Sequence, residues 1–196
     1  MEWDEDERGF SFALLGSSAV SVGLYFIGIV YYGAWPFWFL NCNLFLAWIP
    51  LMLSTGLVYY LKQNRWVSWQ GITLTILWLL FLPNSFYLAT DLIHLGTVGS
   101  DTILYYVVLL FSFAVNGMIL GYTSLYQVHK QLAKRLRSNA AHYWTAAILL
   151  LCSFAIYLGR YLRWSTWDIV ANPAGVMFDV SDRVINPVSH GQTFQI

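Results

Sequence analysis

The sequence predicts an all-α protein, a polytopic transmembrane helical bundle, and three observations carry this prediction. Hydrophobic residues make up 58% of the 196 residues. Charged residues make up only 10%, whereas about a quarter of the residues in an ordinary soluble domain are charged. Crossing a hydrocarbon core takes ~20 residues of helix. Five apolar stretches reach that length, at residues 10–32, 37–61, 66–89, 102–126 and 141–162.

The basic residues predict how the chain is oriented. Two spans separate the loop after the second stretch from the loop after the fourth, so both loops lie on one side. Seven of the ten basic residues fall on that side: Arg8, Lys62, Arg65, Lys130, Lys134, Arg135 and Arg137. Because positive charge concentrates in cytoplasmic loops, we expect a cytoplasmic N-terminus.

Three segments follow from this topology. Residues 1–9 form an acidic cytoplasmic N-terminus, residues 10–163 the transmembrane bundle, and residues 164–196 an extracytoplasmic tail. We expect a multi-pass protein of the cell membrane, with the lipid bilayer as its surroundings and partner. The net charge is zero, so the chain lacks the excess of basic residues that is typical of proteins that bind nucleic acid. The oligomeric state stays open.

Small and polar residues inside the spans predict helix packing. A stripe of Ala114, Gly117, Gly121 and Ser124 lies along one face of the fourth stretch and should let another helix approach closely. Asn116, near the membrane centre, favours a bridge between two helices over a ligand contact. Cysteines 42 and 152 lie at different depths, so we expect no disulfide between them.

The first polar segment, residues 82–95, carries unusual chemistry for a membrane. Pro83 cannot continue the hydrogen-bond ladder, so a break or bend above ~20° is expected near it. After it, four polar side chains fall on one helical face at i, i+3, i+7 and i+10. They are Asn84, Tyr87, Asp91 and His94.

The second polar segment, residues 159–168, leaves the membrane on the same predicted side. If the fifth helix continues, four of its side chains share a face: Arg160, Arg163, Trp164 and Trp167. Asp168 lies one turn beyond Trp164. Because an unpaired charge at membrane depth is costly, we expect Asp91 to pair with Arg160 or Arg163.

Three interpretations of these segments stay open. The two arginines can reach lipid phosphates while the two tryptophans form an interfacial belt. Alternatively, Asp91 and an arginine form a structural salt bridge without a ligand. In the third interpretation both segments build a functional pocket. Asp91 and His94 could join Asp101, Asp168 or His190 around a metal, but no recognised signature orders such a set. We therefore assign no metal ligand, and any cofactor is unknown.

Both segments resemble a bacterial multi-pass membrane family known only as a domain of unknown function. The resemblance rests on Leu82-Pro83-Asn84, Tyr87 and residues 90–95, and on Gly159-Arg160, Arg163-Trp164 and Trp167-Asp168. It covers roughly residues 66–190. Members of that family often have a further hydrophobic segment, and whether this protein has such a sixth span stays open. The resemblance supports the fold and implies no activity, substrate or cofactor.

Three functional hypotheses follow. In the leading one, an extracytoplasmic polar pocket binds a lipid headgroup or small anionic solute through Arg160 and Arg163. Asn84, Tyr87, Trp164, Trp167 and Asp168 complete the proposed binding set. Asp91 and His94 orient the arginines or handle protons. In the second, the protein is a membrane-embedded enzyme acting on a lipid-linked substrate, with Asp91 or His94 as general base and a metal as an option. In the third, it is a structural or assembly subunit.

Overall fold

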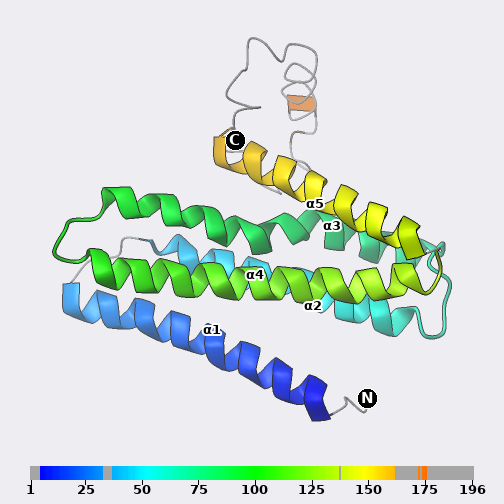
Figure 1. Ribbon diagram of the computed structural model, residues 1–196, viewed down its shortest axis with the longest axis horizontal. Helices are drawn as coiled ribbons and strands as arrows, with labels where there is room; N and C mark the ends of the chain where they lie inside the picture. The colour runs from blue at the N-terminus through cyan, green and yellow to red at the C-terminus, as the bar shows by residue number, and fades with distance from the viewer. Residues whose placement is uncertain (1–4, 33–36, 137, 162–171, 173, 176–196) are drawn as a thin grey trace. The chain divides into compact units, whose positions relative to one another are not determined.

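The computed structural model confirms an all-α chain. It describes residues 5–32, 37–136, 138–161, 172 and 174–175, and these contain helices and no strand. The elements are α1 (Glu5–Tyr32), α2 (Phe39–Tyr60), α3 (Trp69–Thr90), the 3-10 helix η1 (Asp91–Thr97), α4 (Ile103–Ala133) and α5 (Ser138–Tyr161) (Figure 1). In the described residues, five helices are long and apolar enough to cross a membrane, as predicted. The orientation of the chain stays a prediction.

The chain divides into two compact units. The first is Met1–Ile148 and the second is Leu149–Ile196, so α5 begins in the first unit and ends in the second. Within the first unit α2, α3 and α4 pack against one another, and α1 packs against α4 (Figure 1). We call the end where α2 begins and η1 lies the η1 end. The end where α2 and α4 finish is the basic end.

The buried side chains of the first unit are mostly large and apolar. Those with almost no exposure include Trp78, Phe113, Leu40, Leu57, Leu82 and Leu110. Many other large apolar side chains point outward, for example Val30, which is 81% exposed, and Phe45, which is 70% exposed. A soluble monomer rarely exposes such a continuous apolar surface. The surface is therefore suited to lipid tails, which agrees with the five spans.

The small-residue stripe of α4 brings α3 close, as predicted. A methyl group added at Gly117 would lie 2.4 Å from the carbonyl oxygen of Ser85. One added at Gly121 would lie 2.9 Å from the ring of Phe86. At Gly117 the obstacle is a backbone atom, so glycine is what permits this approach, whereas at Gly121 the ring of Phe86 would have to shift. Ala114, in the same stripe, is also buried.

Asn116 bridges two helices, as predicted. Its Nδ2 donates to Ser21 Oγ at 2.9 Å on α1 and to the carbonyl of Ser112 at 2.9 Å within α4. Its Oδ1 accepts from Ser18 Oγ of α1 at 3.4 Å. These bonds occupy both polar atoms of the carboxamide. Asn116 therefore joins α1 to α4.

The predicted break at Pro83 is wrong. α3 continues as an α-helix through Pro83 to Thr90, and the helix type changes only at Asp91, where η1 begins. Proline is tolerated inside a membrane helix when side chains and neighbouring helices satisfy the freed backbone groups. Nearby, Asn84 Nδ2 donates to the carbonyl of Phe81 at 3.2 Å. The angle of any bend at Pro83 stays a prediction.

Candidate functional site

Asp91 and His94, two of the polar residues predicted to carry chemistry, lie in η1, directly after α3. Asp91 is the first residue of η1 and its side chain is fully buried, with 0% exposure. Asn43 of α2 donates from Nδ2 to Asp91 Oδ2 at 3.1 Å. A carboxylate at the centre of a membrane helix costs ~2.5–3.5 kcal/mol on insertion scales, and burial near the end of a span still requires compensation. The hydrogen bond from α2 thus holds a buried carboxylate in one position, on an η1 segment that packs against α4 and α3.

His94 is held by aromatic rings at the same end. Its ring centroid lies 5.2 Å from that of Phe39 and 5.7 Å from that of Phe37. Phe37 also contacts Tyr106 of α4, with centroids 5.3 Å apart. Both ring pairs are tilted, with interplanar angles of 54° to Phe39 and 45° to Phe37. These ring contacts place His94 of η1 beside the residues at the start of α2.

Phe37 adopts a backbone conformation that residues with side chains rarely take. Its φ is 69°, and among the described residues it is the one non-glycine residue with positive φ. Such conformations cost roughly 1–3 kcal/mol and persist where the surroundings enforce them. Here the ring contacts of Phe37 with Phe39, His94 and Tyr106 hold it in place.

The α-to-3-10 change aligns Asp91 and His94. A 3-10 helix has 3.0 residues per turn, so residues three apart lie directly above one another. Asp91 and His94 therefore share one edge of η1, whereas Asn84 and Tyr87 precede it within α3. The predicted continuous stripe of four residues becomes two pairs on two helix types. Asn84 and Tyr87 are both half-buried.

Sequence reasoning missed the contribution of α2 to this end. Asn43 and Asn41 had no visible signal beyond being polar residues in an apolar span, and only the fold brings Asn43 to Asp91. The carboxamide oxygen of Asn41 is buried and has no hydrogen-bond partner among the residues that the structure describes. Buried polar atoms of this kind are uncommon and often meet water or a ligand. Asn41 therefore offers a further acceptor in the first turns of α2.

The second polar segment is only partly described. Arg160 is in the last turn of α5 and belongs to the second unit. Arg163, Trp164, Trp167, Asp168 and His190 lie outside the described residues. The pairing of Asp91 with Arg160 or Arg163 consequently stays a prediction. Among the residues described, no three His, Cys, Asp or Glu side chains gather closely enough to hold a metal ion.

Asp91 and His94 bring a carboxylate and an imidazole to the η1 end. A buried carboxylate fixed by an amide donor can orient a guanidinium group through charge-assisted hydrogen bonds. An imidazole has two ring nitrogens that can donate or accept hydrogen bonds. Asp91 and His94 supply these groups from one edge of η1. Neither group alone defines a reaction.

Comparison with known proteins gives a family without an assigned activity. The model of a family described as a protein of unknown function (DUF1361) matches residues 42–195. The match includes α2 from its fourth residue onward, η1 and both polar segments. No curated protein and no solved structure matches the chain.

Proposed function

Because the chain belongs to the DUF1361 family, whose function is unknown, we propose a function from its own residues. It is a multi-pass membrane protein that binds a small anionic group at the side of the membrane where α3 ends. The anion is the phosphate or carboxylate of a lipid headgroup or of a small solute. Arg160 and Arg163 bind the anion, and Asp91 and His94 orient the arginines and handle protons.

The observation that supports this proposal best is the complete burial of Asp91 at 0% exposure. A membrane helix that needs only to pack has no use for a carboxylate, since an apolar or hydroxyl side chain costs far less. The bond from Asn43 fixes the carboxylate at 3.1 Å. A fixed carboxylate is what an arginine requires in order to present its remaining N–H groups to an anion.

The other residues of the proposed binding set have secondary roles. Trp164 and Trp167 would place amphipathic rings at the headgroup level of the bilayer. Asp168 would offer a second carboxylate to an arginine. Asn84 and Tyr87 precede Asp91 in α3 and would supply neutral polar atoms on the approach to it.

A structural role is the competing proposal, and one specific observation favours it. Polar side chains in the middle of the bundle are bonded to neighbouring helices, as Asn116 is to α1. If Asp91 followed the same rule, its cost would be offset by locking η1 against α2, and no anion would bind. The two proposals differ in what they predict for the purified protein.

The test is the thermal unfolding of the purified full chain in detergent with added sodium phosphate. A ligand that binds only the folded state raises the unfolding midpoint by mass action. We expect phosphate to raise the midpoint, while sodium chloride at equal ionic strength does not. Arg163→Gln should abolish the rise, and the matched change Arg183→Gln should leave it intact. Dioleoylphosphatidylglycerol is tested in parallel to separate a lipid headgroup from a soluble anion.

The outcomes separate the proposals. A phosphate response that Asp91→Asn and Arg163→Gln both remove supports anion binding through the arginines. A response to the lipid alone, lost in the same two variants, assigns the headgroup as the ligand. The proposal is contradicted if the wild-type protein responds to neither probe. If Asp91→Asn and Arg163→Gln are then both less stable than the wild type, the structural role is favoured.

A further inference from the structure

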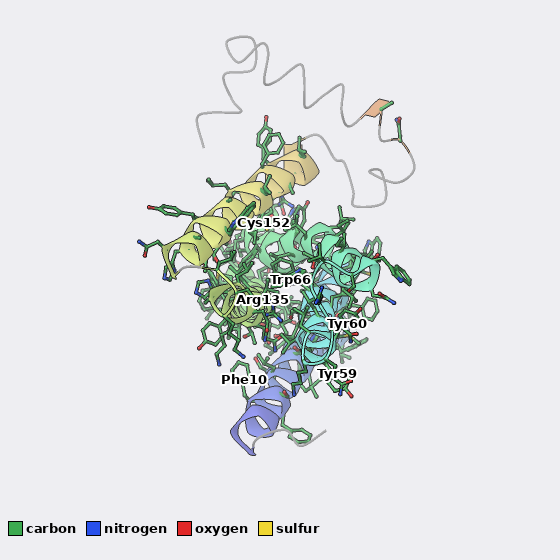
Figure 2. The ribbon with its side chains drawn as sticks, turned by 90° about the vertical axis from the view of Figure 1, so that its right-hand side faces the viewer. Phe10, Tyr59, Tyr60, Trp66, Arg135 and Cys152 are labelled. Carbon is green, nitrogen blue, oxygen red and sulfur yellow. The ribbon has the colours of Figure 1, made fainter. Side chains whose placement is uncertain are left out.

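The basic end carries positive charge that the proposed function does not use, and Arg135 organises it. Arg135 Nη1 donates to the side-chain oxygen of Gln131 at 2.8 Å and to its carbonyl at 3.0 Å. Nη2 donates to the carbonyl of Leu61 at 3.3 Å. The guanidinium carbon lies 5.4 Å from the ring centroid of Trp66 (Figure 2). Arg135 thus joins the end of α4 to the α2–α3 loop.

Further basic residues lie near Arg135, because the residues that it contacts have basic neighbours in the chain. Leu61 is followed by Lys62, and Trp66 is preceded by Arg65. Lys134 precedes Arg135 itself. Four exposed basic residues therefore lie at this end and are called the basic patch: Lys62, Arg65, Lys134 and Arg135.

Aromatic rings lie beside the cations of this end. Lys62 Nζ is 6.0 Å from the ring centroid of Tyr59, and Lys130 Nζ is 5.1 Å from that of Tyr126. Tyrosine and tryptophan settle at the boundary between hydrocarbon and headgroups. The rings of Tyr59, Tyr126 and Trp66 therefore place the nearby cations at the depth of lipid phosphates.

The loops that form the basic patch contain no acid to neutralise it. The sequence has no Asp or Glu between Arg8 and Asp91, or between Asp101 and Asp168. Acidic residues on the same predicted side belong to the N-terminus of the chain, where α1 begins with Glu5, Asp6 and Glu7. The charge of the patch must be balanced either by these residues or from outside the protein.

We propose that the basic patch binds the phosphates of anionic phospholipids in the leaflet at the basic end. Clusters of basic residues next to membrane helices attract such lipids, and the attraction fades within about 10 Å as salt screens it. Lys62 and Lys134 are exposed and available to lipid phosphates, while Arg135 is hydrogen-bonded to Gln131 and Leu61 and connects the end of α4 to the α2–α3 loop. This surface lies at the opposite end of α2 and α3 from Asp91, so it is distinct from the proposed anion site.

The test compares two lipids and two paired variants. Purified full-length protein is stripped of lipid and titrated with dioleoylphosphatidylglycerol or dioleoylphosphatidylcholine, and bound lipid is counted by native mass spectrometry. We expect the wild type to prefer the anionic lipid. The double variant K62Q/K134Q should lose about fivefold in affinity for each lysine removed. The control K62R/K134R keeps the charge and should keep the preference.

Three results would overturn the proposal. One is equal binding of the two lipids by the wild type at low salt. Another is a loss of preference in K62R/K134R as large as in K62Q/K134Q, which would show that shape and not charge matters. The third is a preference that emerges only in E5Q/D6N/E7Q, because the acidic start of α1 would then be the partner of the patch. Arg163→Gln should leave the lysine-dependent part of the preference unchanged, which separates this surface from the anion site.

Discussion

The middle of α3 and its end use polar side chains in different ways. In the middle, Ser85 Oγ donates to the carbonyl of Ala47 at 3.0 Å, and Trp78 Nε1 donates to Ser124 Oγ at 2.7 Å. These groups are neutral and each joins α3 to a neighbouring helix. At the end, the buried group is the carboxylate of Asp91, which costs far more to bury. The middle is thus explained by packing, while the end requires a further reason.

Asp91→Asn should have the largest effect on stability. If Asp91 pairs with an arginine, the change leaves that arginine without its counter-charge, and we expect a loss of ~2–4 kcal/mol in the free energy of unfolding. Unfolding of the purified protein in detergent by a chemical denaturant measures it. Asp101→Asn is the matched control, because Asp101 is exposed, and exposed positions usually change stability by less than ~0.5 kcal/mol.

Equal losses of unfolding free energy in the Asp91 and Asp101 variants would show that the buried carboxylate matters no more for stability than the exposed one. Asp91 would then be an ordinary interfacial carboxylate. A loss of stability in Asp91→Asn alone would show that the end of α3 depends on its buried carboxylate.

Gly117→Ala tests the packed middle and should have the next largest effect. The new methyl group would lie 2.4 Å from the carbonyl oxygen of Ser85, a backbone atom that cannot move alone. Overpacking of this kind costs ~1–3 kcal/mol. Gly56→Ala in α2 is the control, since a methyl group there meets nothing within 4 Å. Unfolding midpoints of both variants give the comparison, and a Gly117 variant as stable as the Gly56 variant would contradict the close approach of α3 and α4.

Ser85→Ala should have the smallest effect. Hydrogen bonds between membrane helices contribute ~0.6 kcal/mol on average, with values up to ~1.7. Ser153→Ala is the control, because Ser153 is exposed and bonds only its own helix, at 3.0 Å from the carbonyl of Leu149. We expect Ser85→Ala to leave phosphate binding unchanged. A loss of phosphate binding in this variant would mean that the middle of α3 also serves the ligand.

The fold could be predicted from the sequence because lipid imposes simple rules. Spans need length and apolarity, and both are visible in the chain. Helix packing was also accessible, since glycine stripes and a lone asparagine have few other uses in a membrane; Gly117 and Asn116 confirm it. Of the break or bend predicted at Pro83, the break does not occur, because one proline does not outweigh the support of neighbouring helices.

The candidate site was less accessible to sequence reasoning. Asp91 and His94 stand out as ionisable residues in an apolar stretch, and both lie at the η1 end. Their partners Asn43, Phe37 and Phe39 could not be found, because their importance arises from tertiary contacts made about 50 residues away in the chain. The change to a 3-10 helix at Asp91 leaves no mark in the residue pattern either.

The most direct test of the proposed role of Asp91 is a double-mutant cycle between Asp91→Asn and each of Arg160→Gln and Arg163→Gln. The free energies of unfolding of the wild type, the single variants and the double variants are measured in one detergent. Residues that interact directly show coupling energies of ~0.5–3 kcal/mol, whereas distant residues are additive within about 0.3–0.5 kcal/mol. We predict a coupling of at least ~1 kcal/mol between Asp91 and one of the two arginines. Additive effects for both arginines would show that Asp91 pairs with neither, and the anion-binding account would then be wrong.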